Sequence, residues 1–329
     1  MPKILVTGAA GYIGSHVARQ LGERGEDLVI LDNLSTGFRS AVLYGDLVIG
    51  DTGDRDLVAR VLADNDVDTV LHFAAHIVVP ESVANPLKYY RNNTSNTRNL
   101  LECCVEAGVK HMIFSSTAAV YGIPAEGAAS EDTPTAPINP YGWSKLMSEQ
   151  MLKDVSAATP LRHVALRYFN VAGADPGGRI GQSTPEATHL LKVACEAVVG
   201  KRPGLSVFGT DYATPDGTCI RDYIHVEDLA AAHLKALDHL RAGGMSATLN
   251  CGYGNGFSVR EMLRMVEKVA GMKLDVAEGP RRAGDPPELI ARAERIREQL
   301  GWQPAHDDLE HIVRTALDWE RRLLRHPMV

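Results

Sequence analysis

The sequence has little of what a disulfide-stabilised, membrane-bound or nucleic-acid-binding protein requires. Its five cysteines form no CxxC pair, and an odd number of them in apolar segments predicts buried free thiols and a reducing compartment. No apolar run reaches the ~18 residues of a membrane span, and we expect no signal peptide because the first predicted strand begins at residue 3. A net charge of -7 without a basic stripe argues against nucleic-acid binding. We therefore expect a cytoplasmic protein without membrane or nucleic-acid partners.

Aromatic residues are also few, at 6%, but 45% hydrophobic and 23% charged residues are typical of an ordinary globular protein. The 329 residues are enough for one large domain or two. Short apolar segments alternate with helical patterns: the former lie near 3–7, 28–32, 46–50, 69–73, 111–116 and 163–168, the latter near 12–24, 54–64, 86–107 and 141–157. This alternation predicts an α/β fold with a doubly wound parallel sheet.

Three glycines follow the first predicted strand: Gly8, Gly11 and Gly14 in the segment TGAAGYIGS, at the turn into the first predicted helix. Glycine at such a turn lets the backbone approach a pyrophosphate, whose charge the helix N-terminus stabilises. The second strand ends in Asp32-Asn33. An acid at that point accepts hydrogen bonds from the adenosine ribose hydroxyls and repels a 2′-phosphate. The pattern predicts a Rossmann-type dinucleotide site and favours NAD over NADP.

A hydroxyl, a tyrosine and a lysine follow the fifth predicted strand. Thr117 lies at the carboxyl end of that strand, where open parallel sheets bind ligands. Asn139 and Pro140 predict the N-cap and first residue of a helix, so Tyr141 and Lys145 become i and i+4 neighbours on one face. An ammonium beside a phenol favours the phenolate, and we expect it to lower the pKa of Tyr141 enough to make this residue a general base. Together these groups predict hydride transfer at a carbinol carbon.

Further segments are more specific than the glycine turn: HFAAH, ESVANPLKYYRNN, FSSTAAVYG, INPYGWSK, LRYFN, GTCIRDYIHVEDLA and PRRAGDPP. With these segments the chain resembles, almost end to end, the UDP-glucose 4-epimerase family of the extended short-chain dehydrogenase/reductases. The resemblance implies NAD as cofactor, a UDP-sugar as substrate and a homodimer. It also implies inversion at C4 of a UDP-hexose through a transient 4-keto intermediate.

The resemblance implies roles for individual residues. It assigns catalysis to Thr117, Tyr141 and Lys145. It places NAD against Gly8, Gly11, Tyr12, Ile13, Gly14, Asp32, Asn33, Asp51, Thr52, Phe73, Ala74, Ala75, Asn92, Ser115, Tyr141, Lys145 and Tyr168. It places the sugar nucleotide against Thr117, Asn170, His189, Leu190, Val207, Phe208, Arg221, Arg282, Asp285 and Leu289. The arginines suit a diphosphate because the guanidinium fork matches phosphate oxygens.

Glycine- and proline-rich loops after Asn170 indicate a change of organisation. We expect a Rossmann NAD-binding domain over 1–170 and a smaller C-terminal sugar-nucleotide-binding domain over 171–329. In relatives of this fold a late strand and helix return to the first domain, here near 220–236 and 248–252. No metal site is expected, since His72 and His76 lack a third ligand at suitable spacing.

Some positions depart from the family and leave alternatives open. Ile77 stands where family members carry a lysine near the nicotinamide, and Leu289 is of intermediate size at the position that controls substrate breadth. A UDP-N-acetylglucosamine or UDP-glucuronate 4-epimerase therefore stays an alternative. A sugar-nucleotide 4,6-dehydratase is disfavoured, because that family carries an Asp-Glu pair where Ala118-Ala119 follow Thr117. A redox-sensing NAD-binding regulator would tolerate loss of the tyrosine or lysine, yet both are present.

Overall fold

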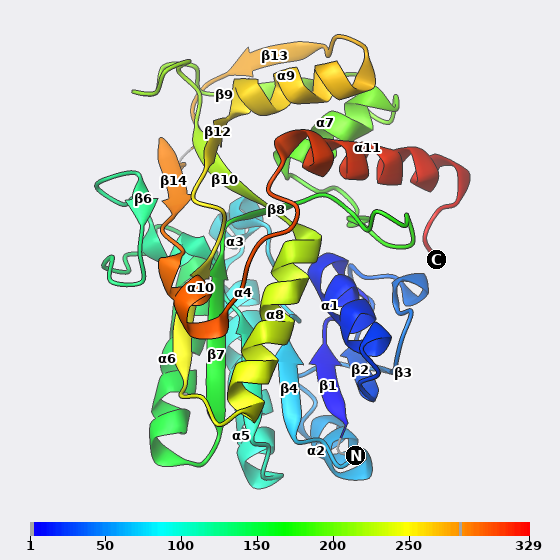
Figure 1. The fold of residues 1–329 in the computed structure, drawn as a ribbon, viewed down its shortest axis with the longest axis vertical. Helices are drawn as coiled ribbons and strands as arrows, with labels where there is room; N and C mark the ends of the chain where they lie inside the picture. The colour runs from blue at the N-terminus through cyan, green and yellow to red at the C-terminus, as the bar shows by residue number, and fades with distance from the viewer. Residues whose placement is uncertain (1–2, 283–284) are drawn as a thin grey trace.

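The computed structural model describes residues 3–282 and 285–329 and is built around one large parallel sheet (Figure 1). Its seven strands lie in the order β11-β7-β5-β4-β1-β2-β3, so the chain winds outward from β1 in both directions. The strands are β1 (Ile4–Thr7), β2 (Leu28–Asp32), β3 (Asp46–Ile49), β4 (Thr69–His72), β5 (His111–Ser115), β7 (Arg162–Tyr168) and β11 (Ala247–Cys251). Every neighbouring pair is parallel. The predicted Rossmann-type doubly wound α/β fold is confirmed.

Central strands of this sheet are buried on both faces, which explains their uninterrupted apolar sequences. The covering helices are α1 (Tyr12–Glu23), α2 (Arg55–Asp64), α5 (Asn96–Glu106), α6 (Pro140–Ala158) and α8 (Val226–Arg241). Helix α8 lies along α1 and also contacts β5 and β7 (Figure 1). The start of α6 follows the sequence prediction, because the Asn139 side chain accepts from the Gly142 amide at 2.9 Å and Pro140 is the first helical residue.

The helix predicted near 86–107 is present over Pro86–Glu106, but it contains a π-helical segment that was not predicted. After α3 (Val79–Ala84), the chain forms α4 (Pro86–Tyr89), a π-helical segment over Tyr90–Ser95, and then α5. The Asn93 carbonyl accepts side-chain hydroxyls from Thr97 at 2.6 Å and Ser148 at 3.1 Å. Because these hydroxyls satisfy the carbonyl, the backbone can widen here without leaving a buried polar group unpaired.

A second body covers the carboxyl edge of the main sheet (Figure 1). Its five-stranded sheet is ordered β12-β10-β14-β6, with β8 beside β10, and a separate pair joins β13 to β9. The strands are β6 (Ala128–Ala129), β8 (Asn170–Ala172), β9 (Leu205–Phe208), β10 (Ile220–His225), β12 (Gly256–Ser258), β13 (Val276–Gly279) and β14 (Glu288–Ala291). The helices are α7 (Leu190–Val198), α9 (Val259–Ala270), α10 (Glu294–Leu300) and α11 (Leu309–Arg325). Three short 3₁₀ or π segments complete the order, at Arg39–Ala41, Tyr90–Ser95 and Ala118–Tyr121.

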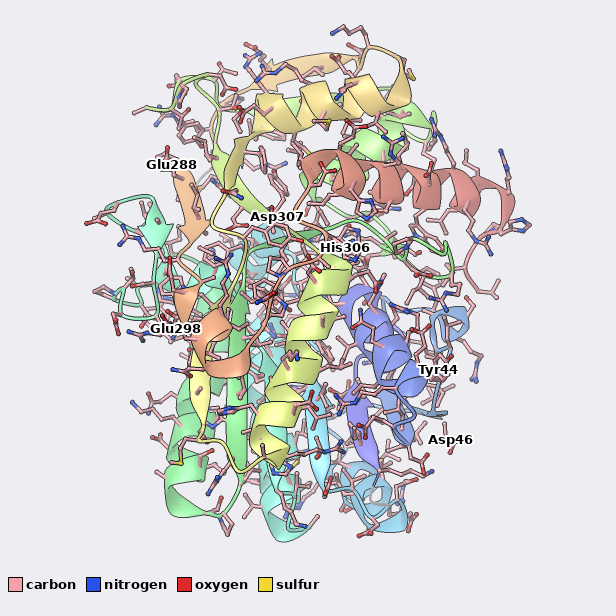
Figure 2. All side chains as sticks on the ribbon, viewed as in Figure 1. Tyr44, Asp46, Glu288, Glu298, His306 and Asp307 are labelled. Carbon is pink, nitrogen blue, oxygen red and sulfur yellow. The ribbon has the colours of Figure 1, made fainter. Side chains whose placement is uncertain are left out.

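The two predicted return segments behave differently. Strand β11 pairs with β7 as the last strand of the main sheet, and α8 of the segment 220–236 packs against that sheet, whereas β10 of the same segment lies in the second sheet. The loop before α11 docks on the start of α8, where the amides of Ala305 and His306 donate to the Asp228 carboxylate at 2.9 and 2.8 Å. Figure 2 shows His306 and Asp307 at this junction, with Glu288 further out beside β14. The domain boundary at residue 170 stays a prediction.

All five cysteines are buried and free, as expected. Within residues 3–282 and 285–329, no helix has the length and apolar character needed to cross a membrane.

Candidate active site

The glycine turn between β1 and α1 is closed by a neighbouring loop. Gly8 has a φ of +76°, and a Cβ there would lie 2.5 Å from the Ala74 amide nitrogen. A Cβ on Gly14 would likewise collide with the Gly8 carbonyl. Only glycine therefore lets the β1–α1 turn and the loop after β4 approach each other, and the result is bare backbone at a helix N-terminus. Predicted cofactor residues Gly11, Tyr12 and Ile13 continue this turn into α1.

Asp32 joins the glycine turn to the end of β2. Its Oδ2 accepts from the Ala10 amide at 2.9 Å and its Oδ1 from the Leu34 amide at 2.8 Å. Burial raises the pKa of this carboxyl, and the two amides oppose that rise by favouring the charged form. The same hydrogen bond holds Leu34 at a φ of +56°, a conformation that side chains rarely adopt.

The predicted adenosine residues form one cluster. The Asn33 amide donates to Asp51 Oδ2 at 2.9 Å, and Asn96 donates to Asp51 Oδ1 at 2.8 Å. Thr52 is buried beside them, and its carbonyl accepts from Asn99 at 2.6 Å. Asn96 and Asn99 were not predicted from the sequence, because polar residues on one face of a helix do not indicate which loop that face contacts.

His72 is held between two threonines at the end of β4. Thr7 Oγ1 lies 2.6 Å from Nδ1, and Thr97 Oγ1 lies 2.9 Å from Nε2. Since the Thr97 proton is used on the Asn93 carbonyl at 2.6 Å, Nε2 must carry the ring hydrogen and Nδ1 must accept from Thr7. Burial, with the nearby Lys145 charge, lowers the pKa of His72 to about 3. His72 is a neutral structural link, and the described residues contain no cluster able to hold a metal.

Asn93, which the sequence analysis did not single out, ties this region to α6. Its Oδ1 accepts from the His76 amide at 2.8 Å, and its Nδ2 donates to the His76 carbonyl at 2.9 Å and to Ser144 Oγ at 3.1 Å. The predicted cofactor residue Asn92 precedes it and donates to Asn93 Oδ1 at 3.0 Å. The loop that reaches His76 contains the predicted cofactor residues Phe73, Ala74 and Ala75. The Phe73 amide donates to the Thr7 carbonyl at 2.9 Å.

The three predicted catalytic side chains meet beyond the end of β5. The Thr117 hydroxyl lies close enough to Tyr141 to favour its phenolate, while Lys145 Nζ donates to the Ser115 carbonyl at 2.8 Å. The Ser115 hydroxyl pairs with the Tyr168 hydroxyl, and Lys145 lies over the Phe114 ring at 4.9 Å. All three predicted catalytic residues are buried.

The expected effect of Lys145 on the pKa of Tyr141 is wrong for the protein without ligands. Burial raises the pKa of Tyr141, and the Thr117 hydroxyl only partly counters that rise. Burial also lowers the pKa of Lys145 to about 7, against the opposing effect of the Glu149 carboxylate. Desolvation disfavours both charged forms, and i, i+4 spacing on a helix cannot show how much water the fold removes.

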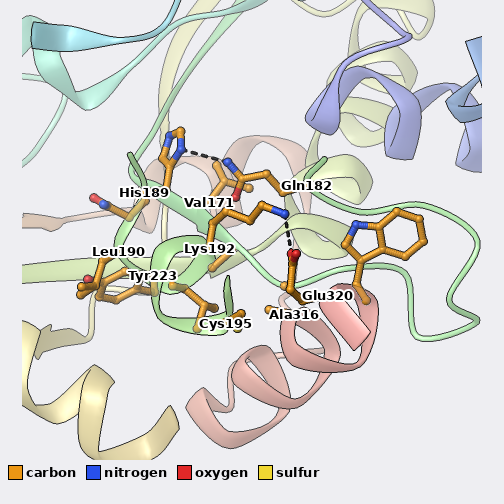
Figure 3. A pocket seen from close by; sticks show the side chains of 14 residues that line it. Val171, Gln182, His189, Leu190, Lys192, Cys195, Tyr223, Ala316 and Glu320 are labelled. Atoms are coloured by element: carbon orange, nitrogen blue, oxygen red, sulfur yellow. Dashed lines mark hydrogen bonds and ion pairs between the residues drawn. The ribbon is translucent and has the colours of Figure 1, made fainter. Parts of the chain in front are cut away.

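On the second body, a separate set of predicted residues surrounds an inner cavity. It is lined by Asn170 from β8 and by His189 and Leu190 at the start of α7 (Figure 3). His189 Nδ1 lies 2.9 Å from Gln182 Nε2, and Lys192 forms an ion pair with Glu320 at the far wall (Figure 3). These contacts fix the α7 terminus beside β8.

The predicted diphosphate and uridine residues gather around β9, β10 and β14. Arg282 stacks on the Phe208 ring, with its guanidinium carbon 3.9 Å from the ring centre, and Val207 is buried beside Phe208. Arg221 lies 3.8 Å from the Asp285 carboxylate, and Leu289 is its partner in the β10–β14 register.

One contact links the two halves of the site. Tyr12, in the first turn of α1, donates its hydroxyl to the Gly173 carbonyl at 2.6 Å, just beyond β8. The glycine turn and the second body are thus coupled directly. Tyr12 contributes its backbone to the turn and its side chain to this bridge.

A family model described as the NAD dependent epimerase/dehydratase family matches residues 4–252, which include the glycine turn and the Thr117, Tyr141 and Lys145 cluster. The chain belongs to this family. A UDP-glucose 4-epimerase of Azospirillum brasilense is 61% identical over 323 residues, which cover 98% of this chain and 93% of that relative.

Solved structures of the epimerase/dehydratase family agree in fold. A UDP-glucose 4-epimerase from Brucella ovis in complex with NAD has a TM-score of 0.94 and 46% identity, covering 97% of this chain and 98% of its own. The UDP-Glc/GlcNAc 4-epimerase of Campylobacter jejuni has a TM-score of 0.86 and 50% identity, and the match covers 98% of this chain and 100% of that structure. The family includes epimerases and dehydratases, and the residues after Thr117 help to distinguish them. Ala118 and Ala119 begin a 3₁₀ turn and carry no acidic or basic side chain.

Proposed function

We propose that this protein is an NAD-dependent UDP-hexose 4-epimerase that interconverts UDP-glucose and UDP-galactose. The observation that carries the proposal is the buried cluster of Thr117, Tyr141 and Lys145 beside a glycine turn. Relatives named UDP-glucose 4-epimerase, which are up to 61% identical over 98% of the chain, support the proposal.

The residues present fit NAD. Gly8 and Gly14 leave no room for side chains at the turn, and the start of α1 supplies unpaired amides for a pyrophosphate. The Asp32 carboxylate suits two ribose hydroxyls, and the Asn33–Asp51–Asn96 cluster suits the adenosine end. When bound, NAD supplies an acceptor and later a donor of hydride at its nicotinamide ring.

Tyr141 acts as the base toward the sugar 4-hydroxyl. Loss of the C4 hydride and of the hydroxyl proton together leaves a 4-keto sugar, and the proton passes to Tyr141 Oη. The Thr117 hydroxyl lies close to Tyr141 and helps to hold the sugar 4-oxygen in place. Lys145 supports the phenolate by its charge, which is why its own protonation state matters to the rate. Return of hydride to the opposite face of C4, with return of the proton, inverts that carbon.

Inversion requires the sugar to turn over while its nucleotide stays bound. The charged groups lie at the nucleotide end: Arg221 and Arg282 suit the diphosphate, and Phe208 offers a flat surface for the base. Strong binding away from the pyranose leaves the 4-keto sugar free to rotate.

The alternatives have less support. Elimination of water, as in a 4,6-dehydratase, needs an acid/base pair, and Ala118 and Ala119 offer only methyl groups. A regulator would not need Tyr141 and Lys145 held in one buried cluster. Conversion of UDP-N-acetylhexoses is favoured as a second activity by Leu289 and by the name of the Campylobacter relative, a UDP-Glc/GlcNAc 4-epimerase.

Proton NMR of the purified protein with UDP-galactose, without added NAD, tests the proposal. We expect UDP-glucose to accumulate until equilibrium, because the cofactor is regenerated in each turnover and needs no external supply. Release of a dehydrated 4-keto-6-deoxy product would establish a dehydratase instead. Unchanged substrate with a protein shown to hold NAD would contradict the proposal.

We also propose that the protein is a cytoplasmic homodimer. Leu87 on α4 and Trp143 on α6 leave 75% and 42% of their surfaces exposed, and both α3 and α4 lie against α6. With Val83 and Met147 they form an exposed apolar group that a second copy would cover. The five free cysteines favour a reducing compartment.

Light scattering of a Leu87→Glu/Trp143→Glu variant tests the dimer. We expect the mass to fall to that of one chain, whereas Met245→Glu, in the loop between α8 and β11 and about as exposed as Leu87, should leave it unchanged. A wild-type protein that is already monomeric at micromolar concentration would contradict the dimer.

A further inference from the structure

Glu149 is the third member of a row on α6. Tyr141, Lys145 and Glu149 are spaced by four residues, so they share one face of the helix, and all three are buried. A buried carboxylate is costly unless it is paired and hydrogen-bonded. Glu149 meets both conditions: Arg167 Nε donates to Oε1 at 2.9 Å and Nη2 to Oε2 at 2.6 Å, and Ser116 Oγ also donates to Oε1.

The pair continues into a buried network. Arg167 Nη1 donates to the Tyr121 hydroxyl at 3.0 Å, and that hydroxyl donates to Asn250 Oδ1 at 2.6 Å. Asn250 in turn donates to the Ala129 carbonyl at 2.8 Å. The carboxylate is thus fixed from β7, β11 and the second sheet, one helical turn from Lys145, and it cannot move from this position without breaking several hydrogen bonds.

Ser116 connects this network to the reacting groups. Its neighbours are Ser115, whose carbonyl accepts from Lys145 at 2.8 Å, and Thr117, whose hydroxyl lies close to Tyr141. Successive side chains of extended chain point to opposite sides, so Ser116 faces Glu149 while its neighbours face the active site. Glu149 therefore acts on both the helix and the strand end that hold Lys145.

We propose that Glu149 is a positioning residue for the reaction, whose fixed carboxylate keeps the Lys145 side chain charged and directed at the Ser115 carbonyl. The inference rests on the proposed roles of Tyr141 and Lys145. It adds a residue that touches neither cofactor nor sugar.

The surroundings of Lys145 explain why such a residue is needed. The groups facing it are Tyr141 and Glu149 on α6, Phe114 and Ser115 on β5, His72 on β4 and, through Ser115, Tyr168 on β7. His72 stays neutral, and the two tyrosines are phenols in the resting protein. Among the described residues, Glu149 is the carboxylate that raises the pKa of Lys145 against its burial. Without that charge, less of the lysine would be protonated at neutral pH.

The test is a titration of Lys145 itself. The holoenzyme is labelled with [¹³Cε]lysine, its carbon NMR signals are followed with pH, and the Lys145 signal is assigned by its absence in Lys145→Met. In Glu149→Gln, which keeps the size and one acceptor oxygen, we expect the midpoint to fall by about one pH unit. The alkaline limb of the kcat profile should move by the same amount. Glu310→Gln on α11, which breaks an ion pair with Lys268 on α9 and lines no predicted site, should move neither.

Glu149→Gln leaves Arg167 buried and unpaired, which is strongly destabilising. A Glu149→Gln/Arg167→Gln variant removes both charges and serves if the single variant does not fold. Its Lys145 midpoint should still lie below that of the wild type, because Glu149 and not Arg167 acts on Lys145. If Lys145 titrates in either folded variant with the same midpoint as in the wild type, the proposal is overturned, even if kcat is reduced. The titration needs no sugar nucleotide, so its failure is distinct from failure of the epimerase assignment.

Discussion

Replacing Tyr141 by phenylalanine should separate catalysis from folding. The ring is buried and lies edge-on to Tyr89, with centroids 6.5 Å apart, and phenylalanine keeps that packing. Losing the polar contact between the Tyr141 hydroxyl and Thr117 costs about 1 kcal/mol of folding free energy or less. For a chain of this size that corresponds to a decrease in Tm of no more than about 4 °C.

The chemical loss should be much larger. Without the base, kcat should fall by a factor on the order of 10²–10⁴, which corresponds to about 3–5.5 kcal/mol of activation free energy. Because burial raises the pKa of Tyr141, the side chain is mostly protonated at and below neutral pH, so the phenolate fraction and with it the wild-type kcat should rise with pH in that range. That rise should be absent from the variant.

The assay is epimerisation of UDP-galactose followed by proton NMR, with NAD content and thermal unfolding measured on the same samples. Tyr89→Phe is the matched control, since the single hydroxyl hydrogen of Tyr89 is shared between the Val78 carbonyl at 2.7 Å and a Glu81 carboxylate oxygen at 2.9 Å. Tyr89→Phe should lower Tm more than Tyr141→Phe does, and it should lower kcat far less. A Tyr141→Phe protein that turns over within tenfold of the wild type would refute the assignment of the base.

Three further outcomes are expected. Gly8→Ala should abolish NAD retention and lower Tm more than Gly25→Ala, because both have positive φ but only the Gly8 Cβ would strike Ala74; equal Tm losses would contradict the close approach. Asp32→Asn should narrow the preference for NAD over NADP, measured by calorimetry on the NAD-free protein, because it removes the charge that repels a 2′-phosphate; an unchanged ratio would exclude that role. Leu289→Tyr should abolish conversion of UDP-N-acetylgalactosamine and largely spare that of UDP-galactose, because leucine can change rotamer where an aromatic ring fills the space; an unchanged ratio of the two kcat/KM values would show that this residue does not line the sugar pocket.

Local patterns predicted most of the fold because they report local physics. Strands buried on both faces need continuous apolar sequence, which marked β1, β2 and β4, whereas the edge strand β3 is only partly buried. The start of α6 was predictable because Asn139 and Pro140 cap it through contacts within one turn. Gly8 was predictable because its conformation excludes other residues.

Features that depend on another element were missed. The π-helical segment forms where the Asn93 carbonyl meets hydroxyls from Thr97 and from Ser148 on α6, and the sequence does not show that these segments meet. The pKa of Tyr141 was predicted in the wrong direction for the same reason. Helical spacing places Lys145 beside Tyr141, whereas the Ser115 carbonyl that takes up its ammonium comes from β5.

Asp32 illustrates how far a correct prediction can still be incomplete. The sequence predicts an acceptor for ribose hydroxyls, and the structure shows that both carboxylate oxygens already accept backbone amides, at Ala10 and Leu34. A carboxylate has about four lone-pair sites, so two remain for a ribose diol. The two amides also hold the glycine turn and the strained Leu34 against each other. The choice of cofactor and the geometry of the glycine turn therefore both depend on the Asp32 side chain. A substitution of Asp32 that changes the cofactor preference must also change the turn.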